Sequence, residues 1–170
     1  MKILAAFGAT GLVLAAAGGV FFFGVFSTVA GTRGDPPAVA WALIKVREAS
    51  IRRHATEKAP PLDGADMVRA GAAAYAARGC VACHGGPGVA WQKFSEGLHP
   101  DPPDLKKVVT ERSPEELFFV VKNGINMTGM PSFKLAGVDD PEIWSIVAFL
   151  KKLPDVSEQD FKTWSASAAK

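Results

Sequence analysis

The segment Cys80-Val81-Ala82-Cys83-His84 contains both cysteines of this 170-residue chain and one of its three histidines. Two cysteines can form neither a disulfide scaffold nor a four-cysteine zinc site. A zinc site with mixed ligands needs two more ligands, and His54 and His99 are poorly placed in the sequence to supply them. A redox dithiol of the thioredoxin kind needs a βαβ pattern around the motif, and no stretch of this chain alternates in hydropathy as a strand does.

The spacing Cys-x-x-Cys-His is that of covalent haem attachment. Two thiols three positions apart on one helical turn can add to the two vinyl groups of a haem. The histidine that follows is then directed at the iron and leaves one axial position open. The motif therefore predicts one haem c, bound through thioethers at Cys80 and Cys83, with His84 as an axial iron ligand.

A loop further along the chain contains Met127 and Met130, and it is expected to supply the second axial ligand. Pro131 restrains the backbone directly after Met130, and Gly129 permits a close approach to the haem, so Met130 is the predicted ligand. Packing against the haem edge or against a helix is the alternative role for Met127. Histidine–methionine ligation raises the reduction potential and suits electron transfer rather than oxygen binding. His99 remains an alternative ligand that gives a bis-histidine haem.

Capping signals divide the region around the motif into helices. Ser113-Pro114-Glu115-Glu116 forms a capping box with proline at the first helical position. No stretch alternates with a period of two, so an all-α domain is predicted, with long glycine- and proline-rich loops at 85–105 and 124–138. The predicted helices cover 63–78, 114–123 and 140–153, and Ser157 caps a last short one.

The N-terminal part of the chain is strongly apolar, with no charged residue from Ile3 to Thr32. As one helix this stretch is about 45 Å long, against about 30 Å of bilayer hydrocarbon. The alternative is a cleaved signal peptide with Thr28-Val29-Ala30 as its cleavage site, but the apolar stretch is about twice as long as the usual 7–15 residues. A retained membrane anchor over 1–32 is expected. Gly11, Ala15 and Gly19 share one face, which either receives a neighbouring membrane subunit or reflects the usual composition of such segments.

The segment 33–61 is basic in character. Residues 1–61 carry seven basic and three acidic side chains, whereas residues 62–170 carry twelve and fourteen. The net charge of +2 is too small to suggest nucleic acid as a partner. A helix is predicted over 38–55, lying on lipid headgroups or against a partner subunit, and a proline-rich linker follows it. The apolar positions of this helix share one arc: Val39, Ala42, Leu43, Val46 and Ala49.

Residues 62–154 resemble class I cytochrome c. The resemblance rests on Gly71 and Tyr75 before the cysteine motif, on Gly129-Met130-Pro131, and on a closing helix that contains Trp144. It implies the cytochrome c fold, with first and last helices crossing near Gly71, Tyr75, Trp144 and Ala148. It also implies that the carbonyl of Pro87 orients the His84 ring. The haem would form the centre of the core, wrapped by Leu105, Val109, Phe119, Ile125 and Phe133.

With its N-terminal anchor and the segment Gly97–Leu105, the chain is similar to bacterial membrane-anchored monohaem cytochromes. The resemblance implies a haem domain on the periplasmic side of the cytoplasmic membrane, although the basic residues after the anchor favour the opposite orientation by charge alone. The predicted order is anchor (1–32), juxtamembrane helix and linker (33–61), cytochrome domain (62–154) and C-terminal tail (155–170).

The implied function is single-electron transfer in a respiratory or photosynthetic chain, from a quinol-oxidising complex to a terminal oxidase or reaction centre, with no catalytic residue of its own. The alternatives are a fixed subunit of a larger redox complex and, from another class, a haem enzyme or gas sensor. The expected partners are redox proteins and the lipid bilayer. Several lysines either ring the haem edge and steer an acidic redox partner or serve only as solubilising residues: Lys93, Lys106, Lys107, Lys122 and Lys134.

Overall fold

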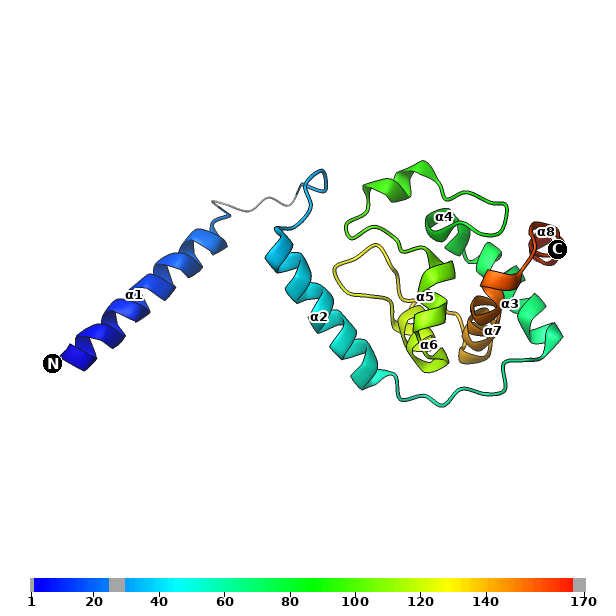
Figure 1. The fold of residues 1–170 in the computed structure, drawn as a ribbon, viewed down its shortest axis with the longest axis horizontal. Coiled ribbons are helices and arrows are strands. Elements are labelled where there is room, and N and C mark those ends of the chain that lie inside the picture. The colour runs from blue at the N-terminus through cyan, green and yellow to red at the C-terminus, as the bar shows by residue number, and fades with distance from the viewer. Residues whose placement is uncertain (1, 25–29, 167–170) are drawn as a thin grey trace. The chain divides into compact units, whose positions relative to one another are not determined.

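The computed structural model describes residues 2–24 and 30–166, in two compact units, Met1–Arg33 and Gly34–Lys170 (Figure 1). The described part is all-helical, as predicted, and its only β-feature is an isolated bridge between Gly86 and Val89. The α-helices are α1 (Lys2–Phe22), α2 (Pro37–His54), α3 (Ala65–Ala77), α4 (Cys80–His84), α5 (Leu105–Glu111), α6 (Pro114–Asn123), α7 (Asp140–Lys152) and α8 (Glu158–Ala166). Two short 3₁₀ helices are η1 (Lys93–Gly97) and η2 (Leu153–Asp155).

Helix α1 is shorter than the sequence suggested. It ends at Phe22 because Gly24 has a left-handed backbone (φ 65°) and donates its N–H to the carbonyl of Phe21 at 3.0 Å. The expectation of one helix through Thr32 was wrong, and residues 25–29 of the expected anchor lie outside the described residues. In the described part of the chain, no helix has both the length and the hydropathy needed to cross a membrane.

The small-residue face of α1 is open. A Cβ built at Gly11 or Gly19 finds no atom within 4 Å among the described residues. A neighbouring membrane subunit at this face remains one of the two interpretations of the sequence.

Helices α3 and α7 cross closely in the second unit, and they lie side by side in Figure 1. A Cβ at Gly71 would lie 1.8 Å from the carbonyl oxygen of Ser145, so only glycine permits this approach. The rings of Tyr75 and Phe149 meet 5.3 Å apart beside the crossing, and Ala148 is fully buried there. The predicted crossing of first and last helices is confirmed.

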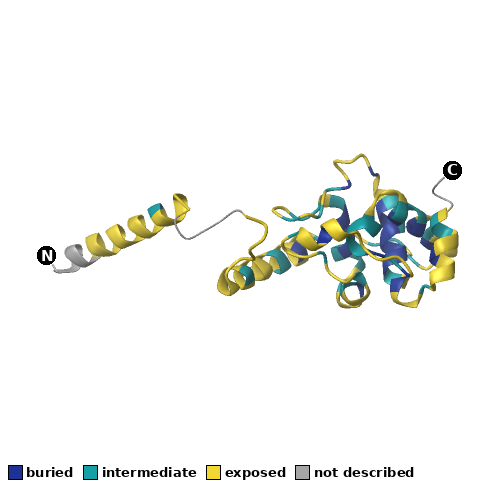
Figure 2. Cartoon of the chain, turned by 90° about the horizontal axis from the view of Figure 1, so that it is seen from above, coloured by how far each residue is buried: buried dark blue, intermediate teal, exposed yellow. Residues whose placement is uncertain are grey.

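Helix α6 also packs against α7 and completes the core. Its capping box is formed as predicted: the Ser113 hydroxyl accepts from the Glu116 N–H at 3.2 Å, and the Glu116 carboxylate accepts from the Ser113 N–H at 3.1 Å. The ring of Phe118 stacks on the indole of Trp144 with centroids 4.0 Å apart. Figure 2 shows the buried residues gathered on these helices and the exposed ones on the outer turns.

The C-terminal helix α8 packs against α3. Ser157 caps it, accepting the Asp160 N–H at 3.0 Å. Phe161 is buried, with its ring 5.6 Å from that of Phe149 and 6.2 Å from that of Tyr75. Helix α8 therefore belongs to the hydrophobic core that supports the cysteine motif.

Helix α2 packs against α6 of its own chain, a contact that the sequence did not reveal. Ile51 is buried, and Arg112 donates to both carboxylate oxygens of Glu48 at 2.6 and 2.7 Å. The rings of His54 and Phe119 stack 6.2 Å apart. The segment Gly34–Lys170 therefore includes α2 as a docked element.

The ion pair that docks α2 predicts a pH-dependent stability. Burial opposes the charge of Glu48, but Arg112 and then Arg47 outweigh it, so the pKa of Glu48 lies below its usual 4.5. A lowered pKa in the folded state gives a stabilisation that is complete above pH 4.5 and disappears as the pH falls through the folded value. We expect Glu48→Gln to cost about 2 kcal/mol at pH 7. Urea unfolding of both proteins should give converging midpoints as the pH falls below 4.5, and a constant difference would contradict this assignment.

Candidate functional site

The cysteine motif forms the short helix α4, which is bounded by two glycines with left-handed backbones. Gly79 precedes it with φ 78° and Gly85 follows it with φ 65°. A Cβ at Gly85 would lie 2.8 Å from the carbonyl oxygen of Val89, so the exit from the motif requires glycine. These two turns place Cys80, Cys83 and His84 on a single helical turn, as the spacing predicted.

A buried hydrogen bond ties this turn to the core. The Tyr75 hydroxyl donates to the carbonyl of Gly85 at 2.7 Å, and the Tyr75 side chain is 1% exposed. Burial, reinforced by the neighbouring Cys80 and Cys83, raises the pKa of Tyr75 far above its usual value. The phenol therefore stays protonated and remains a donor.

Removing this hydroxyl should loosen the exit of the motif. In Tyr75→Phe the Gly85 carbonyl loses its hydrogen-bond donor inside the core, which should lower the free energy of unfolding by about 1–3 kcal/mol. Thermal unfolding of the haem-loaded protein should show this loss. Phe149→Leu is a useful comparison, because it perturbs the ring contact with Tyr75 but keeps the hydroxyl. Equal stability of Tyr75→Phe and the wild type would show that the bond has no net effect.

His84 is oriented by the loop that follows the motif. Its Nδ1 lies 3.1 Å from the carbonyl oxygen of Pro103, and a carbonyl can only accept, so Nδ1 carries the proton. The other ring nitrogen, Nε2, is then left with its lone pair available for a metal. Burial lowers the pKa of His84, and the bond to Pro103 opposes this shift without reversing it, so the neutral ring is favoured.

The predicted role of Pro87 was therefore wrong. Pro87 is buried, but the carbonyl that meets His84 belongs to Pro103. The loop 85–89 folds back on itself through the Gly86–Val89 bridge, and the chain returns to the His84 ring only at Pro103. The Pro-Pro-Asp segment at 102–104 provides this carbonyl directly before α5.

The two thiols are half-buried and free of any disulfide. Burial raises the pKa of the Cys80 thiol to about 12, and the nearby Cys83 adds to this shift. Among the described residues, no group of three His, Cys, Asp or Glu side chains is arranged to hold a metal ion.

The structure distinguishes the two candidate methionines. Met130 is half-buried and packs against the hydrophobic core, whereas Met127 is 91% exposed and has a positive φ of 58°. The loop around Met130 is fixed by its own hydrogen bonds: the Met130 N–H donates to Thr128 Oγ1 at 3.1 Å, and the Met130 carbonyl accepts from Ile125 N–H at 3.1 Å. This arrangement favours Met130 as the residue turned inward, and its role as an iron ligand stays a prediction.

The histidine-side and methionine-side loops meet. A Cβ at Gly129 would lie 2.8 Å from Cδ1 of Leu98, so glycine at this position allows the loop 91–104 to contact the Met130 loop. The same loop is fixed at its start, where the Gln92 N–H donates to the carbonyl of Ala82 inside the motif at 2.8 Å.

A cavity of about 240 Å³ adjoins the motif. Most of its lining has no signal in the sequence, because the loop 91–104 has no regular hydropathy pattern. The cavity is lined by Cys83, His84, Trp91, Ser95, Glu96, Asp101, Pro102, Pro103 and Asp104.

The predicted haem-pocket residues are only partly assembled around the motif. Phe133 is buried in the core, and Leu105 packs against it. Ile125 is half-buried in the Met130 loop. Phe119 instead stacks on His54 of α2. The assignment of these side chains to the haem remains a prediction.

Two of the lysines predicted to ring the haem edge have partners within the chain. Lys122 is largely buried and lies 2.8 Å from Asp140 and 3.5 Å from Glu57, with its ammonium 5.0 Å above the Phe118 ring. Hydrogen bonding to Asp140 raises the pKa of Lys122. Lys93 pairs with Glu96 at 2.6 Å. Lys122 therefore holds the linker and the start of α7 to α6, and it was wrongly assigned to a docking surface.

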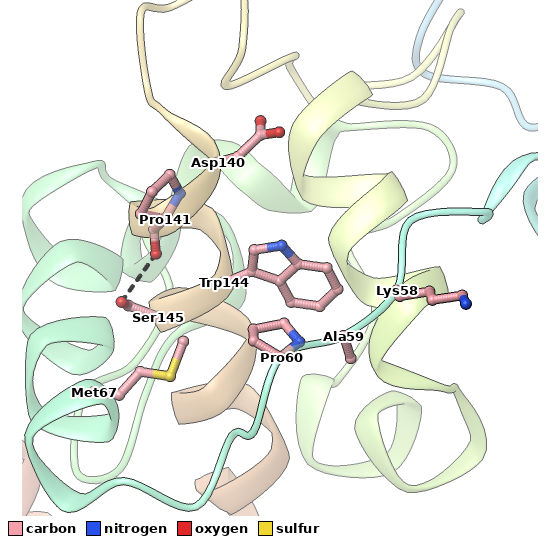
Figure 3. Close-up of a pocket in the computed structure, with 8 residues that line it drawn as sticks. All are labelled: Lys58, Ala59, Pro60, Met67, Asp140, Pro141, Trp144 and Ser145. Carbon is pink, nitrogen blue, oxygen red and sulfur yellow. Dashed lines mark hydrogen bonds between the residues drawn. The ribbon is translucent and has the colours of Figure 1, made fainter.

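A second cavity, of about 530 Å³, lies away from the cysteine motif, where the proline-rich linker crosses the start of α7 (Figure 3). Trp144, Pro60 and Met67 form its apolar wall, and Ser145 donates to the Pro141 carbonyl at 3.0 Å. None of the predicted site residues lines it.

A family model described as Cytochrome C oxidase, cbb3-type, subunit III, matches residues 66–150. The matched segment runs from α3 to α7 and contains the motif, the Pro103 carbonyl and Met130. Helices α1, α2 and α8 lie outside it. No curated protein and no solved structure matches the chain.

Proposed function

This chain belongs to the family described as Cytochrome C oxidase, cbb3-type, subunit III, and on that premise we propose that it carries single electrons as a membrane-anchored, periplasm-facing cytochrome c. The chain is a c-type cytochrome with covalently bound haem c, and electron transfer is the activity of such a domain. In the proposal, Cys80 and Cys83 hold the haem, and His84 and Met130 bind its iron.

The residues of the site fit this cofactor. The two thiols and the imidazole project from one helical turn. Because the Pro103 carbonyl accepts from Nδ1 of His84, the lone pair of Nε2 is available to bind iron. Met130 is turned inward on a loop closed by hydrogen bonds. When bound, haem c supplies an iron that changes between the ferric and ferrous states. The chain itself would fix the two ligands, His84 through the Pro103 carbonyl and Met130 through its hydrogen-bonded loop, and an iron held by both favours electron transfer over ligand exchange.

The observation that carries the proposal is the hydrogen bond from His84 Nδ1 to Pro103. It fixes the ring for metal binding, and the inward Met130 offers a second ligand. Exposure of the reduced protein to carbon monoxide tests this point. A doubly ligated iron should not bind carbon monoxide rapidly, whereas rapid binding would favour a haem enzyme or gas sensor.

The membrane part of the proposal is supported by the sequence from Ile3 to Thr32, which has no charged residue. The proposed location is the bacterial cytoplasmic membrane, with the haem domain on the periplasmic side, where the resemblance places haem attachment. Alkaline carbonate extraction of isolated membranes tests the anchor. We expect the haem-bearing chain to stay in the pellet, and its release into the supernatant would contradict the anchor.

A second candidate is a fixed subunit of a larger redox complex, because the family description names an oxidase subunit. A native gel of gently solubilised membranes, stained for haem peroxidase activity, separates the two candidates. A haem band near the mass of one chain in detergent indicates a diffusing carrier between quinol-oxidising complex and oxidase or reaction centre. A band of high mass that contains this chain indicates a fixed subunit.

A further inference from the structure

Helix α2 carries two different faces. The face toward α6 includes buried Ile51, and it carries Glu48, whose charge is paired with Arg112. At about 100° per residue, Val39 and Val46 lie roughly 120° and 140° around the helix from Ile51. They are 45% and 68% exposed, so the described residues leave the apolar arc found in the sequence uncovered.

The outer face is apolar along three turns. Leu43 between the two valines is 55% exposed, and Ala42 and Ala49 are exposed beside it. The described residues of the unit provide no cover for this arc. Trp41 is 63% exposed as well, about 80° from Ile51 in the direction opposite to the valines. An exposed arc of this kind on an otherwise docked helix indicates an external contact.

All charged side chains on the exposed surface of α2 are basic. Lys45, Arg52 and Arg53 are all exposed. Glu48, the one acidic residue of α2, lies against Arg112 at 2.6 Å and contributes no negative charge to the outer face. A helix that exposes an apolar arc and a tryptophan, and whose exposed charges are all cationic, has the composition of a helix that lies in the headgroup region of an anionic bilayer.

We propose that the outer face of α2, formed by Val39, Ala42, Leu43, Val46 and Ala49, lies on anionic lipid headgroups. The inference rests on the proposed membrane anchor, since only four residues separate Thr32 from the start of α2 at Pro37. Charge complementarity favours lipid over a second protein surface. Because Ile51 and the Glu48–Arg112 pair fix α2 to α6, this contact sets the orientation of the whole haem-binding unit on the membrane.

A thiol introduced on this face provides the test. The variant Val46→Cys is made in the full-length, haem-loaded chain, in which thioether formation leaves the introduced thiol as the only free one. The chain is reconstituted into nanodiscs of phosphatidylglycerol mixed with phosphatidylcholine, or of phosphatidylcholine alone. The alkylation rate by a charged, membrane-impermeant maleimide is measured. Gln159→Cys, at an exposed position of α8, is the matched control.

We expect alkylation of Val46→Cys to be about tenfold slower than that of Gln159→Cys in the anionic discs, and markedly faster in the neutral discs. Adding Arg52→Gln and Arg53→Gln should restore much of the rate in anionic discs, because each basic residue near such a surface strengthens binding roughly fivefold. The control should react at the same rate in both lipids.

Two results would overturn the inference while the anchor stands. Equal, fast alkylation of both positions in anionic discs would show that the outer face is uncovered. Slow alkylation at Val46→Cys in both lipids would show that a protein surface, such as a second copy, covers it. A haem-loaded chain that does not enter the discs at all would refute the anchor itself, and the lipid contact with it.

Discussion

Met130→Ala is expected to lose the low-spin, methionine-ligated spectrum of the oxidised protein, and its reduction potential is expected to fall. Met130 is the half-buried methionine of the loop and the proposed second ligand, so its removal should open one axial position while His84 stays held by Pro103. Axial ligands tune haem potentials over about 0.8 V, and we expect a fall on the order of 0.1–0.3 V. The reduced variant should also bind carbon monoxide rapidly. Spectroelectrochemical titration measures both the spectrum and the potential.

The matched control is Met127→Ala. Met127 is 91% exposed three residues away on the same loop, so its loss should leave spectrum and potential nearly unchanged. If Met127→Ala produces the large change and Met130→Ala does not, the ligand assignment is wrong. A normal spectrum in both variants would point to another ligand, such as His99.

Gly71→Leu prevents the domain from folding around its haem. Even the first side-chain carbon would lie 1.8 Å from the Ser145 carbonyl oxygen and 3.0 Å from Cβ of Phe149, so α3 and α7 must separate. Separation uncovers Tyr75, which holds the exit of the cysteine motif. We expect the free energy of unfolding to fall by more than about 4 kcal/mol, because overpacking against a backbone carbonyl is among the most destabilising changes. The yield of haem-bearing chain and its urea midpoint measure the effect.

Ala70→Leu is the control for the helix crossing. Ala70 is the neighbouring residue in α3 and is exposed, so a larger side chain there finds room. Its haem yield and urea midpoint should match the wild type within about 0.5 kcal/mol. A folded, fully haem-loaded Gly71→Leu protein would show that the helices do not approach as closely as the structure has them.

Local signals in the sequence were sufficient for much of the fold. The capping box at Ser113 predicted where α6 begins, because caps are determined by residues a few positions apart. The cysteine motif became one helical turn for the same reason. The crossing of α3 and α7 was expected from the family resemblance, and Gly71 explains it physically.

Long-range pairings were not predictable in the same way. The carbonyl that orients His84 comes from Pro103, nineteen positions away, and the loop between them has no periodic pattern that reveals its path. Helix α5 went unpredicted, although Asp104 caps it by accepting the Lys106 N–H. The docking of α2 depends on Glu48 meeting Arg112, a pair separated by 64 positions.

Lys122 illustrates the same limit for charge. In the sequence it is one lysine among several, and a solvated docking role was a reasonable expectation. In the fold it lies between Asp140 and Glu57 above an aromatic ring, so its charge is used inside the protein. Which lysines are paired within the chain therefore could be decided only from the three-dimensional structure.

The mass of the intact purified chain tests whether one haem c is attached through Cys80 and Cys83. We expect a mass equal to that of the chain plus one haem, and the haem should remain after acid–acetone extraction. The double variant Cys80→Ala and Cys83→Ala should lose the haem entirely. A wild-type chain with no added mass, or a haem that the extraction removes, would refute covalent attachment.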